Sequence, residues 1–483
     1  MLSRRGSRIG FLSFLLTASL LAAGFAGRAS AAAHVPAAVA RKIDGDVKSL
    51  LHRYAVPGAT VMVLQNGRVT FVEAYGSRDL RRRLPARPDT FFEIGSITKQ
   101  FTAASILQLQ AAGKLQIDRP LSDYLPDAPH AKEVTLRQLL THTSGLHDYL
   151  DLRPRELDRL ASRPISYDDL IARIAPLPLD FAPGSQWSYS NTGYLLLGKV
   201  IETVSGETYE GYLRRHILGP LQMKNTHTTA DEARLPNAAI GYEHVGGKLE
   251  HAPIIDPSWA GAAGFLVAPM SDLAKWDQAL RGGKIVSPAS YREMTTPFMT
   301  TKNGSADYGL GLFVDSAYGE PRIGHTGGSI GFTTADEYFP RQDLRVIAFT
   351  NLGDNTPEAG EALTNIIFAD LYPAIAAKAQ KPAAGENAAI TQTVRAAFRQ
   401  LQTGTDYSRF AAHLRDKLDS GSGAKFVTSL GPYGAPSAAV FKGVRQDAKD
   451  TWYDYVVQFG PGVSIPFAAK IGPDGSVAGL SVG

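Results

Sequence analysis

The feature that most constrains the fold is the placement of strand-forming segments at both ends of one long region. After an amphipathic helix expected at 38–53, residues 58–76 form two apolar runs around Asn66-Gly67, a dipeptide typical of tight hairpin turns. Residues 96–290 have a mostly helical pattern, broken by Pro-Gly and Gly-rich turns. Strand patterns return at 308–315, 321–328, 333–340 and 344–351. We therefore predict one α+β unit whose antiparallel sheet combines strands from both ends.

A second, smaller unit is expected after a segment rich in alanine, proline and lysine. Beyond that segment, residues 389–420 indicate a pair of helices. Strand-like segments follow at 424–431, 438–444, 451–459, 463–471 and 476–482, with Pro473-Asp474-Gly475 as the last hairpin turn. The predicted organisation is a first domain at 34–372, a linker at 373–388 and a small α+β domain of unknown role at 389–483.

The N-terminal residues 1–31 have the pattern of a secretory signal peptide. A basic start, with Arg4 and Arg5, precedes an uncharged apolar run, and the run ends at residues 29–31, Ala-Ser-Ala, a small-residue cleavage site. An uncleaved membrane anchor is the alternative, but serine, threonine and glycine dilute the run. We expect an exported chain, periplasmic or secreted, with no stable membrane insertion after cleavage, and the export route stays open.

Charge and cysteine content narrow the function classes. The formal net charge is +4, and the signal segment holds four arginines and no acid, so about zero is left for the mature chain. No basic surplus points to a nucleic-acid partner. The chain has no cysteine, which excludes disulfides, a thiol nucleophile, cysteine-based metal sites and a lipid-modified cysteine. The sequence indicates no cofactor.

Residues 93–101, EIGSITKQF, place a single lysine at the start of an apolar helix. The segment 97–112 has good helix formers and no Gly or Pro, and Gly113 supplies a C-terminal stop. Ser96 would lie at the helix N-terminus, with Lys99 one turn later on the same face. Burial and the positive end of the helix both lower the pKa of such an amine. The amine could then accept the proton of the neighbouring hydroxyl.

Taken alone, this short and common spacing favours an N-cap serine and a lysine that reaches the surface. Two further segments favour chemistry. Tyr189 and Asn191 lie in an irregular aromatic stretch just before a helix, and residues 325–328, His-Thr-Gly-Gly, lie at a strand end. A hydroxyl nucleophile needs a base, an oxyanion hole and a substrate contact. A tyrosine can share proton transfer, an asparagine amide can hold a carbonyl, and a glycine-rich strand can donate a backbone N–H.

With these three segments in this order, the chain resembles the serine β-lactamase and penicillin-binding-protein superfamily. The resemblance is to the branch of class C β-lactamases, DD-peptidases, D-aminopeptidases and related esterases. Residues 96–99, SITK, match its S-x-x-K element, 189–191, YSN, match Y-x-N, and 325–327, HTG, match the K-T-G or H-T-G box. The resemblance covers about residues 38–370. It implies a β-lactamase-like domain in which helices flank an antiparallel sheet and an all-helical subdomain is added.

The resemblance implies a role for each matched residue. Ser96 would attack a carbonyl and become acylated, and water would then hydrolyse the acyl-enzyme. Lys99 and Tyr189 would share the work of the base, and which of them takes the proton stays open. Asn191 would orient the substrate and the Lys99 amine. The other candidates would bind substrate or, with the backbone N–H of Ser96, form the oxyanion hole: His325, Thr326, Gly327 and Gly328.

The predicted function is an exported serine hydrolase of DD-peptidase, D-aminopeptidase or esterase type, acting on a small-molecule or peptide acyl donor. The alternatives are a class C-like β-lactamase and a non-catalytic envelope binding protein on the same scaffold. His325 replaces the lysine of the lactamases, and free histidine titrates at about pH 6.5. We therefore expect weak anchoring of a β-lactam carboxylate and a pH step as His325 loses its proton. The sequence does not define the oligomeric state.

Two other patterns compete with this interpretation. Residues 327–331, GGSIG, are a literal G-x-S-x-G, but that motif needs a helix after its serine, and a strand pattern follows here. Its triad would need a downstream histidine, and only His413 remains. His142, His147 and Asp148 could bind a metal, but neither an H-E-x-x-H helix nor a histidine-rich cluster supports them. Polar packing near a turn is the preferred interpretation for these three.

Overall fold

The computed structural model describes residues 34–151, 162–300, 304–305, 307–353, 358–404, 406–419, 421–447 and 450–482. The predicted signal peptide at 1–31 lies outside these residues. Among the described residues, no helix combines the length and apolar character that crossing a membrane requires.

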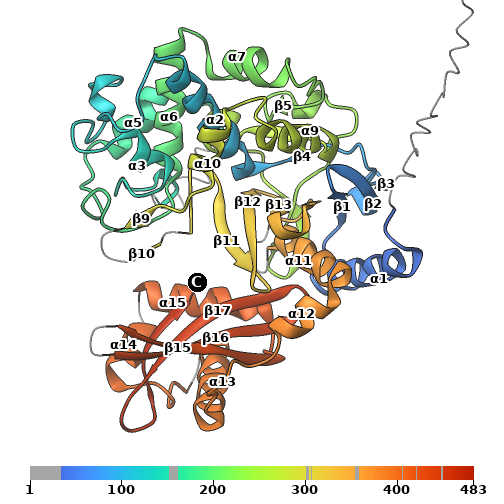
Figure 1. The fold of residues 1–483 in the computed structure, drawn as a ribbon, viewed down its shortest axis with the longest axis vertical. Coiled ribbons are helices and arrows are strands. Elements are labelled where there is room, and N and C mark those ends of the chain that lie inside the picture. Colours follow the sequence, from blue (N-terminus) through green and yellow to red (C-terminus); the bar gives the residue numbers. More distant parts are fainter. Residues whose placement is uncertain are drawn as a thin grey trace, which may run out of the picture. The chain divides into compact units, whose positions relative to one another are not determined.

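A seven-stranded antiparallel sheet forms the centre of the first part of the chain (Figure 1). Its strand order is β11-β12-β13-β14-β1-β2-β3, so strands from both ends of the region lie side by side, as predicted. Asn66 and Gly67 join β1 to β2 with φ of 51° and 70°, the left-handed turn that this dipeptide favours. The strands are β1 (Gly58–Gln65), β2 (Arg68–Asp79), β3 (Leu84–Pro85), β11 (Phe313–Ala317), β12 (Glu320–Ser329), β13 (Phe332–Phe339) and β14 (Leu344–Thr350).

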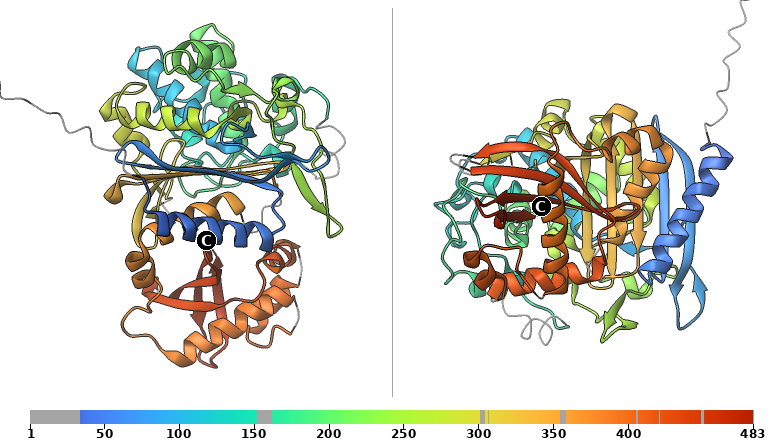
Figure 2. Two further views of the ribbon diagram at one scale, coloured as in Figure 1. Left: turned by 90° about the vertical axis from the view of Figure 1, so that its right-hand side faces the viewer. Right: turned by 90° about the horizontal axis from the view of Figure 1, so that it is seen from below.

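Helices cover both faces of this sheet, as the edge-on view in Figure 2 shows. On one face, α1 (Ala37–Arg53) packs against α11 (Ala359–Leu371), and α11 contacts β13 and β14. The inward stripe of α1 is the one its helical period predicts: Ile43, Val47, Leu50 and Leu51. On the other face, α9 (Met270–Arg281) contacts β1 and β14. Cover on both sides explains why β14 is buried along its whole length.

The region between β3 and β11 is mostly helical, and its central element is α2 (Thr98–Ala111). A single 3-10 turn, η1 (Gly95–Ile97), leads into α2, which packs against α6 and α8 and is buried along most of its length. The other helices are α3 (Leu136–Leu140), α5 (Tyr167–Ile174), α6 (Asn191–Ser205), α7 (Tyr209–Leu213), α8 (Gly261–Gly264) and α10 (Pro288–Met294). Short strands are β4 (Phe92–Glu93), β5 (His227–Thr228), β6 (Tyr242–Val245), β7 (Lys248–His251), β8 (Leu266–Ala268), β9 (Met299–Thr300) and β10 (Gly304–Ser305).

The strand predicted at 308–315 is wrong in its first half, because β11 begins only at Phe313. The preceding residues pass directly beside α2. A Cβ on Gly311, where φ is 72°, would lie 2.7 Å from the Lys99 carbonyl oxygen. This close approach to the helix replaces strand pairing, and only glycine permits it.

The C-terminal part has three helices and a four-stranded antiparallel sheet, of order β15-β16-β17-β18. The predicted strand at 424–431 is wrong, because Val427 and Leu430 bury their side chains at helical spacing in α15. The predicted linker contains a helix, α12 (Pro373–Ala379). The remaining elements are α13 (Ala388–Thr403), α14 (Ala412–Leu418), α15 (Gly421–Leu430), β15 (Ala438–Asp447), β16 (Asp450–Gly460), β17 (Val463–Ile471) and β18 (Val477–Val482).

One apolar cluster includes residues of α1 and α11 together with residues of the C-terminal helices and sheet. The end of β16 and the turn that follows it contact both α1 and α11. The Arg53 guanidinium donates to the Phe459 carbonyl at 3.3 Å, and Asn365 Nδ2 donates to the Gly462 carbonyl at 3.3 Å. A Cβ on Gly462 would lie 2.3 Å from the Ala362 carbonyl oxygen. The predicted boundary at 373–388 therefore stays a prediction, since the two parts share buried contacts.

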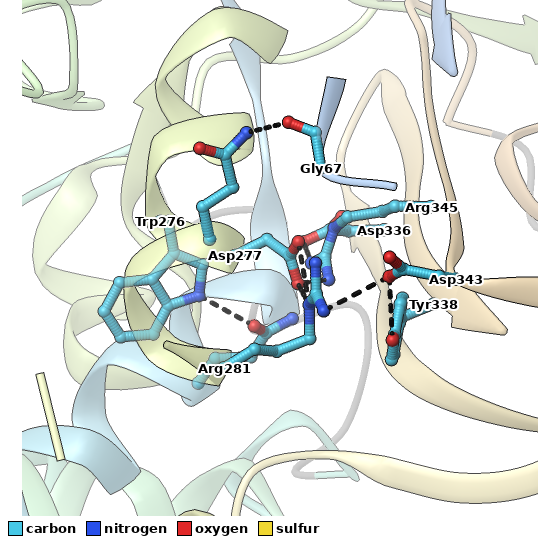
Figure 3. Close-up of polar contacts among 10 residues, drawn as sticks. Gly67, Trp276, Asp277, Arg281, Asp336, Tyr338, Asp343 and Arg345 are labelled. Carbon is cyan, nitrogen blue, oxygen red and sulfur yellow. Dashed lines mark hydrogen bonds and ion pairs between the residues drawn. The ribbon is translucent and has the colours of Figure 1, made fainter. Parts of the chain in front are cut away.

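A buried ionic network fixes α9, the sheet and α2 relative to one another (Figure 3). Arg345 of β14, 5% exposed, contacts Asp336 of β13 and Asp277 of α9, and both acids are buried. Next to Asp277, Trp276 donates its indole N–H to Gln100 Oε1 at 2.8 Å. The Trp276 ring also stacks on Phe101 of α2, with ring centres 4.0 Å apart. Through Asp277 and Trp276, α9 thus links the start of α2 to the sheet.

Candidate active site

Ser96 and Lys99 lie on one face of the start of α2, as their spacing predicts. Ser96 is in the 3-10 turn, and Lys99 follows in the first turn of the helix. The Lys99 side chain is completely buried. Its Nζ lies 2.9 Å from Ser96 Oγ, 2.9 Å from Asn191 Oδ1 and 2.8 Å from the carbonyl oxygen of Ala263. The lysine therefore does not reach the surface.

Burial lowers the pKa of Lys99 to about 7, although the Asp148 carboxylate opposes part of this shift. About half of the amines are therefore neutral at pH 7. A neutral amine has two protons and one lone pair. The Ala263 carbonyl and Asn191 Oδ1 can only accept, so they take both protons. The lone pair is left for the Ser96 hydroxyl, which is the arrangement of a base that removes a serine proton.

Asn191 begins α6, and Asp148 fixes the orientation of its side chain. The Asp148 carboxylate accepts from both the backbone N–H and Nδ2 of Asn191, each at 2.9 Å. Because Nδ2 is committed to a carboxylate, Oδ1 must face Lys99. The sequence predicted only polar packing near a turn for Asp148, and this role in holding Asn191 was not expected. No spacing rule could reveal it, since 43 residues separate the two side chains.

Tyr189 lies beside the lysine, with its ring centre 4.8 Å from Lys99 Nζ. Burial raises the pKa of Tyr189 well above its usual value. The nearby Ser96 side chain opposes this rise in pKa. Among the described residues, however, none forms a hydrogen bond of normal geometry with the Tyr189 hydroxyl. His142, for which the sequence predicted polar packing near a turn, packs on this ring, with 4.2 Å between the ring centres. His142 Nδ1 accepts from the Ser190 N–H at 3.0 Å, which fixes the imidazole against the tyrosine.

The residues considered for a metal site point to different partners. His142 packs on Tyr189, His147 Nδ1 lies 3.2 Å from Asp180 Oδ1, and Asp148 holds Asn191. Within the described ranges, no group of three or more His, Cys, Asp or Glu side chains could hold a metal ion.

The second half of β12 brings an unpaired strand edge to the nucleophile. β11 pairs with β12 only as far as Gly324, whereas β13 pairs with it as far as Ser329. In the described structure, residues 325–329 therefore have a ladder partner on one side only. The turn before Ser96 lies against this segment, because a Cβ on Gly95 would be 2.6 Å from the Gly328 carbonyl oxygen and 3.0 Å from its nitrogen. This glycine contact brings the backbone of the nucleophile turn to β12.

His325 is buried, only 2% exposed, and the expected pH step is wrong. Burial lowers the pKa of His325 to about 3, and the nearby Lys99 lowers it further. The Thr326 carbonyl, 2.5 Å from Nδ1, can only accept, so Nδ1 carries the proton. Nε2 then accepts from the Tyr308 hydroxyl at 2.8 Å. His325 is neutral throughout the usual working range of pH, so it offers no positive charge to a substrate carboxylate.

Comparison with known proteins identifies the family of most of this chain. The family model described as Beta-lactamase matches residues 40–371. The chain belongs to the beta-lactamase family. PbpX of Bacillus subtilis (strain 168), which is named as a penicillin-binding protein, is 34% identical over 296 residues, 61% of this chain and 71% of that protein.

Solved structures share the fold of this chain. The D-amino acid amidase from Ochrobactrum anthropi SV3, in complex with L-phenylalanine amide, matches with 26% identity and a TM-score of 0.60, over 69% of this chain and 98% of that chain. The octameric penicillin-binding protein homologue from Pyrococcus abyssi matches at 23% identity and a TM-score of 0.62, over 92% of this chain and 99% of that chain. The fold is thus the α+β β-lactamase-like fold, followed by a four-stranded antiparallel sheet beyond the residues that the family model matches.

The rival G-x-S-x-G motif does not form the strand-to-helix turn that it requires. Ser329 is the last residue of β12, and the chain continues at Phe332 into β13, a strand of the same sheet. His413, the histidine this motif would need, lies in the C-terminal part, where its Nε2 is 2.9 Å from the Ala478 carbonyl oxygen. Ser329 is thus a hairpin residue in this member of the beta-lactamase family.

Proposed function

We propose that this member of the beta-lactamase family is an exported serine hydrolase that forms an acyl-enzyme on Ser96. Its acyl donors would be amides or esters of D-amino acids, or peptides that contain them. One observation carries the proposal: the buried Lys99 amine directs both protons of its neutral form to obligate acceptors and its lone pair to Ser96. A purely structural role for Lys99 would not explain why its amine is buried with the Ser96 hydroxyl as its third contact.

Acylation would begin when Ser96 Oγ attacks the substrate carbonyl carbon and its proton moves to Lys99 Nζ. Backbone N–H groups of Ser96 and Gly328 would stabilise the developing oxyanion. Collapse of the tetrahedral intermediate breaks the bond to the leaving group, which takes a proton as it departs. Tyr189 would pass that proton on, whereas its raised pKa disfavours it as the first base. Water would then attack the ester on Ser96 and release the acid.

The substrate class rests on two supports. The relatives include proteins named as a penicillin-binding protein and a D-amino acid amidase, so the family site is used on amide bonds. Because His325 is neutral, it supplies no positive charge that would hold a β-lactam carboxylate tightly. We therefore place amide and ester hydrolysis ahead of β-lactam hydrolysis, and export rests on the N-terminal sequence pattern alone.

A substrate panel tests the proposal. The panel contains D- and L-phenylalanine p-nitroanilides, a p-nitrophenyl ester and a chromogenic cephalosporin, each assayed with wild type, Ser96→Ala and Ser329→Ala. We expect hydrolysis of the ester and of the D-anilide, with a loss of at least about 10³-fold in Ser96→Ala. Ser329→Ala is the matched control and should stay near wild type.

Labelling identifies the nucleophile independently of the substrate. A fluorophosphonate should modify the peptide that contains Ser96, as located by mass spectrometry. An adduct on Ser329 would instead support the rival motif. Rapid cephalosporin turnover with no ester or amide hydrolysis would instead indicate that the enzyme is a true β-lactamase.

A further inference from the structure

The face of β12 opposite the catalytic lysine carries two side chains that contact the start of α11. Arg322 Nη1 donates to Glu361 at 2.8 Å, and one helical turn earlier Glu358 lies close enough to the Thr326 side chain for Thr326 to lower its pKa. Residues 322 and 326 are an even number of positions apart on a strand, and 358 and 361 are one turn apart on a helix, so the two pairs lie in register. Glu358 therefore lies beside the H-T-G segment.

The helix start that carries Glu358 is held firmly against the sheet. A Cβ on Gly360 would lie 2.7 Å from the Thr334 carbonyl carbon, and Thr334 is the ladder partner of Gly327. Glu358 is two residues before this contact, at the N-cap of α11. Its charge also acts on Tyr189, so the carboxylate lies within electrostatic range of the site.

Among the residues that the structure describes, the positive charges near this segment are already committed. Arg322 contacts Asp315, Glu337 and Glu361. His325 is neutral, and the Lys99 amine is engaged by Ser96, Asn191 and Ala263. Within the described part of the chain, a ligand that adds along the unpaired edge of β12 would therefore meet a carboxylate beside Thr326 without a free cation.

We propose that Glu358 is a specificity-determining residue that disfavours acyl donors with a carboxylate on the leaving group and favours those whose leaving group is neutral or cationic. The inference rests on the proposed function and sharpens it. D-amino-acid amides and neutral esters fit the site by this criterion. Peptides that release a free D-amino acid, and β-lactams with their ring carboxylate, fit it less well.

The protonation of Glu358 adds a pH dependence to this preference. Burial and Glu361 raise the pKa of Glu358 to about 7, and Thr326 and Arg322 oppose the shift. Tyr189 and Tyr433 also face it, and both are neutral in this range. The discrimination against an anion should grow as pH rises through about 7. Lys99 loses its positive charge over the same range and acts in the same direction, so a Glu358 variant is needed to separate the two.

The test uses the full chain and two matched thioesters of N-acetyl-D-alanine, one with thioglycolate and one with thioglycolamide as the leaving group. They differ only in a carboxylate, and released thiol is measured. Wild type should prefer the amide form at pH 8. Glu358→Gln should shift the ratio of the two kcat/KM values toward the anionic thioester by on the order of 10-fold, and Glu358→Asp should restore the wild-type preference.

Glu73→Gln is the matched control, because it removes the same charge from exposed β2, four strands away from β12 in the sheet. It should leave the ratio unchanged. An unchanged ratio in Glu358→Gln, with both thioesters hydrolysed, overturns this inference and leaves the proposed function standing. If wild type hydrolyses neither thioester nor the p-nitrophenyl ester, the proposed function falls and this inference with it. If the Gln variant does not fold, a wild-type ratio that is flat between pH 5.5 and 8.5 overturns the inference.

Discussion

At the scale of single residues, the proposed chemistry depends on the protonation of one amine. Only neutral Lys99 can take the Ser96 proton, and its pKa in the folded protein is about 7. Below that pH the protonated form dominates and has no lone pair. We expect kcat/KM for a neutral p-nitrophenyl ester to rise through about pH 7 and then level off, with no step from His325. Lys99→Met should lower kcat/KM by about 10²–10⁴-fold. A rising limb centred above pH 9 would contradict the assignment of Lys99 as base.

Asp148 offers a second residue-scale test, because it acts on Lys99 without touching it. Its charge raises the pKa of Lys99, so Asp148→Asn should move the rising limb of the pH profile to lower pH. The variant also has one acceptor oxygen in place of two, so it cannot serve both Asn191 and the Leu150 N–H, and we expect kcat to fall by about 10-fold. Asp180→Asn, which affects only the contact with His147, is the control. A limb that stays in place in Asp148→Asn would show that the carboxylate does not act on the base.

The sequence could predict the site residues that belong to short motifs and not those that reach them from elsewhere. Ser96 and Lys99 share a face because of helical spacing, which is local. Asp148 and Glu358 meet their partners only after folding, so no local pattern identifies them. The lowered pKa of His325 could also not be predicted from the sequence, because it results from burial and not from residue type.

At the scale of elements, α2 depends on the buried network around Arg345. Removing this cation leaves buried Asp336 without its cationic partner and leaves buried Asp277 with Arg281 alone. We expect Arg345→Met to lower the free energy of unfolding by about 3–5 kcal/mol, measured by urea denaturation. Arg445→Met is the control, because the pair of Arg445 with Asp454 is half exposed and worth at most about 1 kcal/mol. Equal losses of unfolding free energy in the two variants would mean that the buried network stabilises the protein no more than an exposed ion pair does.

Elements with a strong period or a specific turn were predictable, and those decided by packing were not. The stripe of α1 and the Asn66-Gly67 hairpin follow from residue spacing and backbone preference. The segment 424–431 is a short apolar run that fits a strand or a helix equally well, and tertiary contacts made it α15. The start of β11 was misplaced because Gly311 packs on α2, a contact that leaves no trace in the local pattern.

At the scale of the whole molecule, the C-terminal part contributes to the core under α1 and α11. A chain that ends at Ala379 would expose the apolar face against which the β16–β17 turn packs. We expect this truncated protein to keep part of its ester hydrolysis, because the residues around Ser96 remain, but to have a lower Tm than the full chain. Thermal unfolding and the p-nitrophenyl ester assay check both points. A folded but inactive truncation would show that the C-terminal part completes the site.

The pairing of β1 with β14 has a consequence for biosynthesis. β1 leaves the ribosome early, yet its partner strand follows only after the entire helical region. At about 5–20 residues per second, that delay is tens of seconds. Throughout it, the β1–β2 hairpin presents an apolar edge that can pair with a wrong strand. Faster translation of the helical region, or a holding chaperone, should therefore raise the yield of soluble protein without changing the stability of the finished fold.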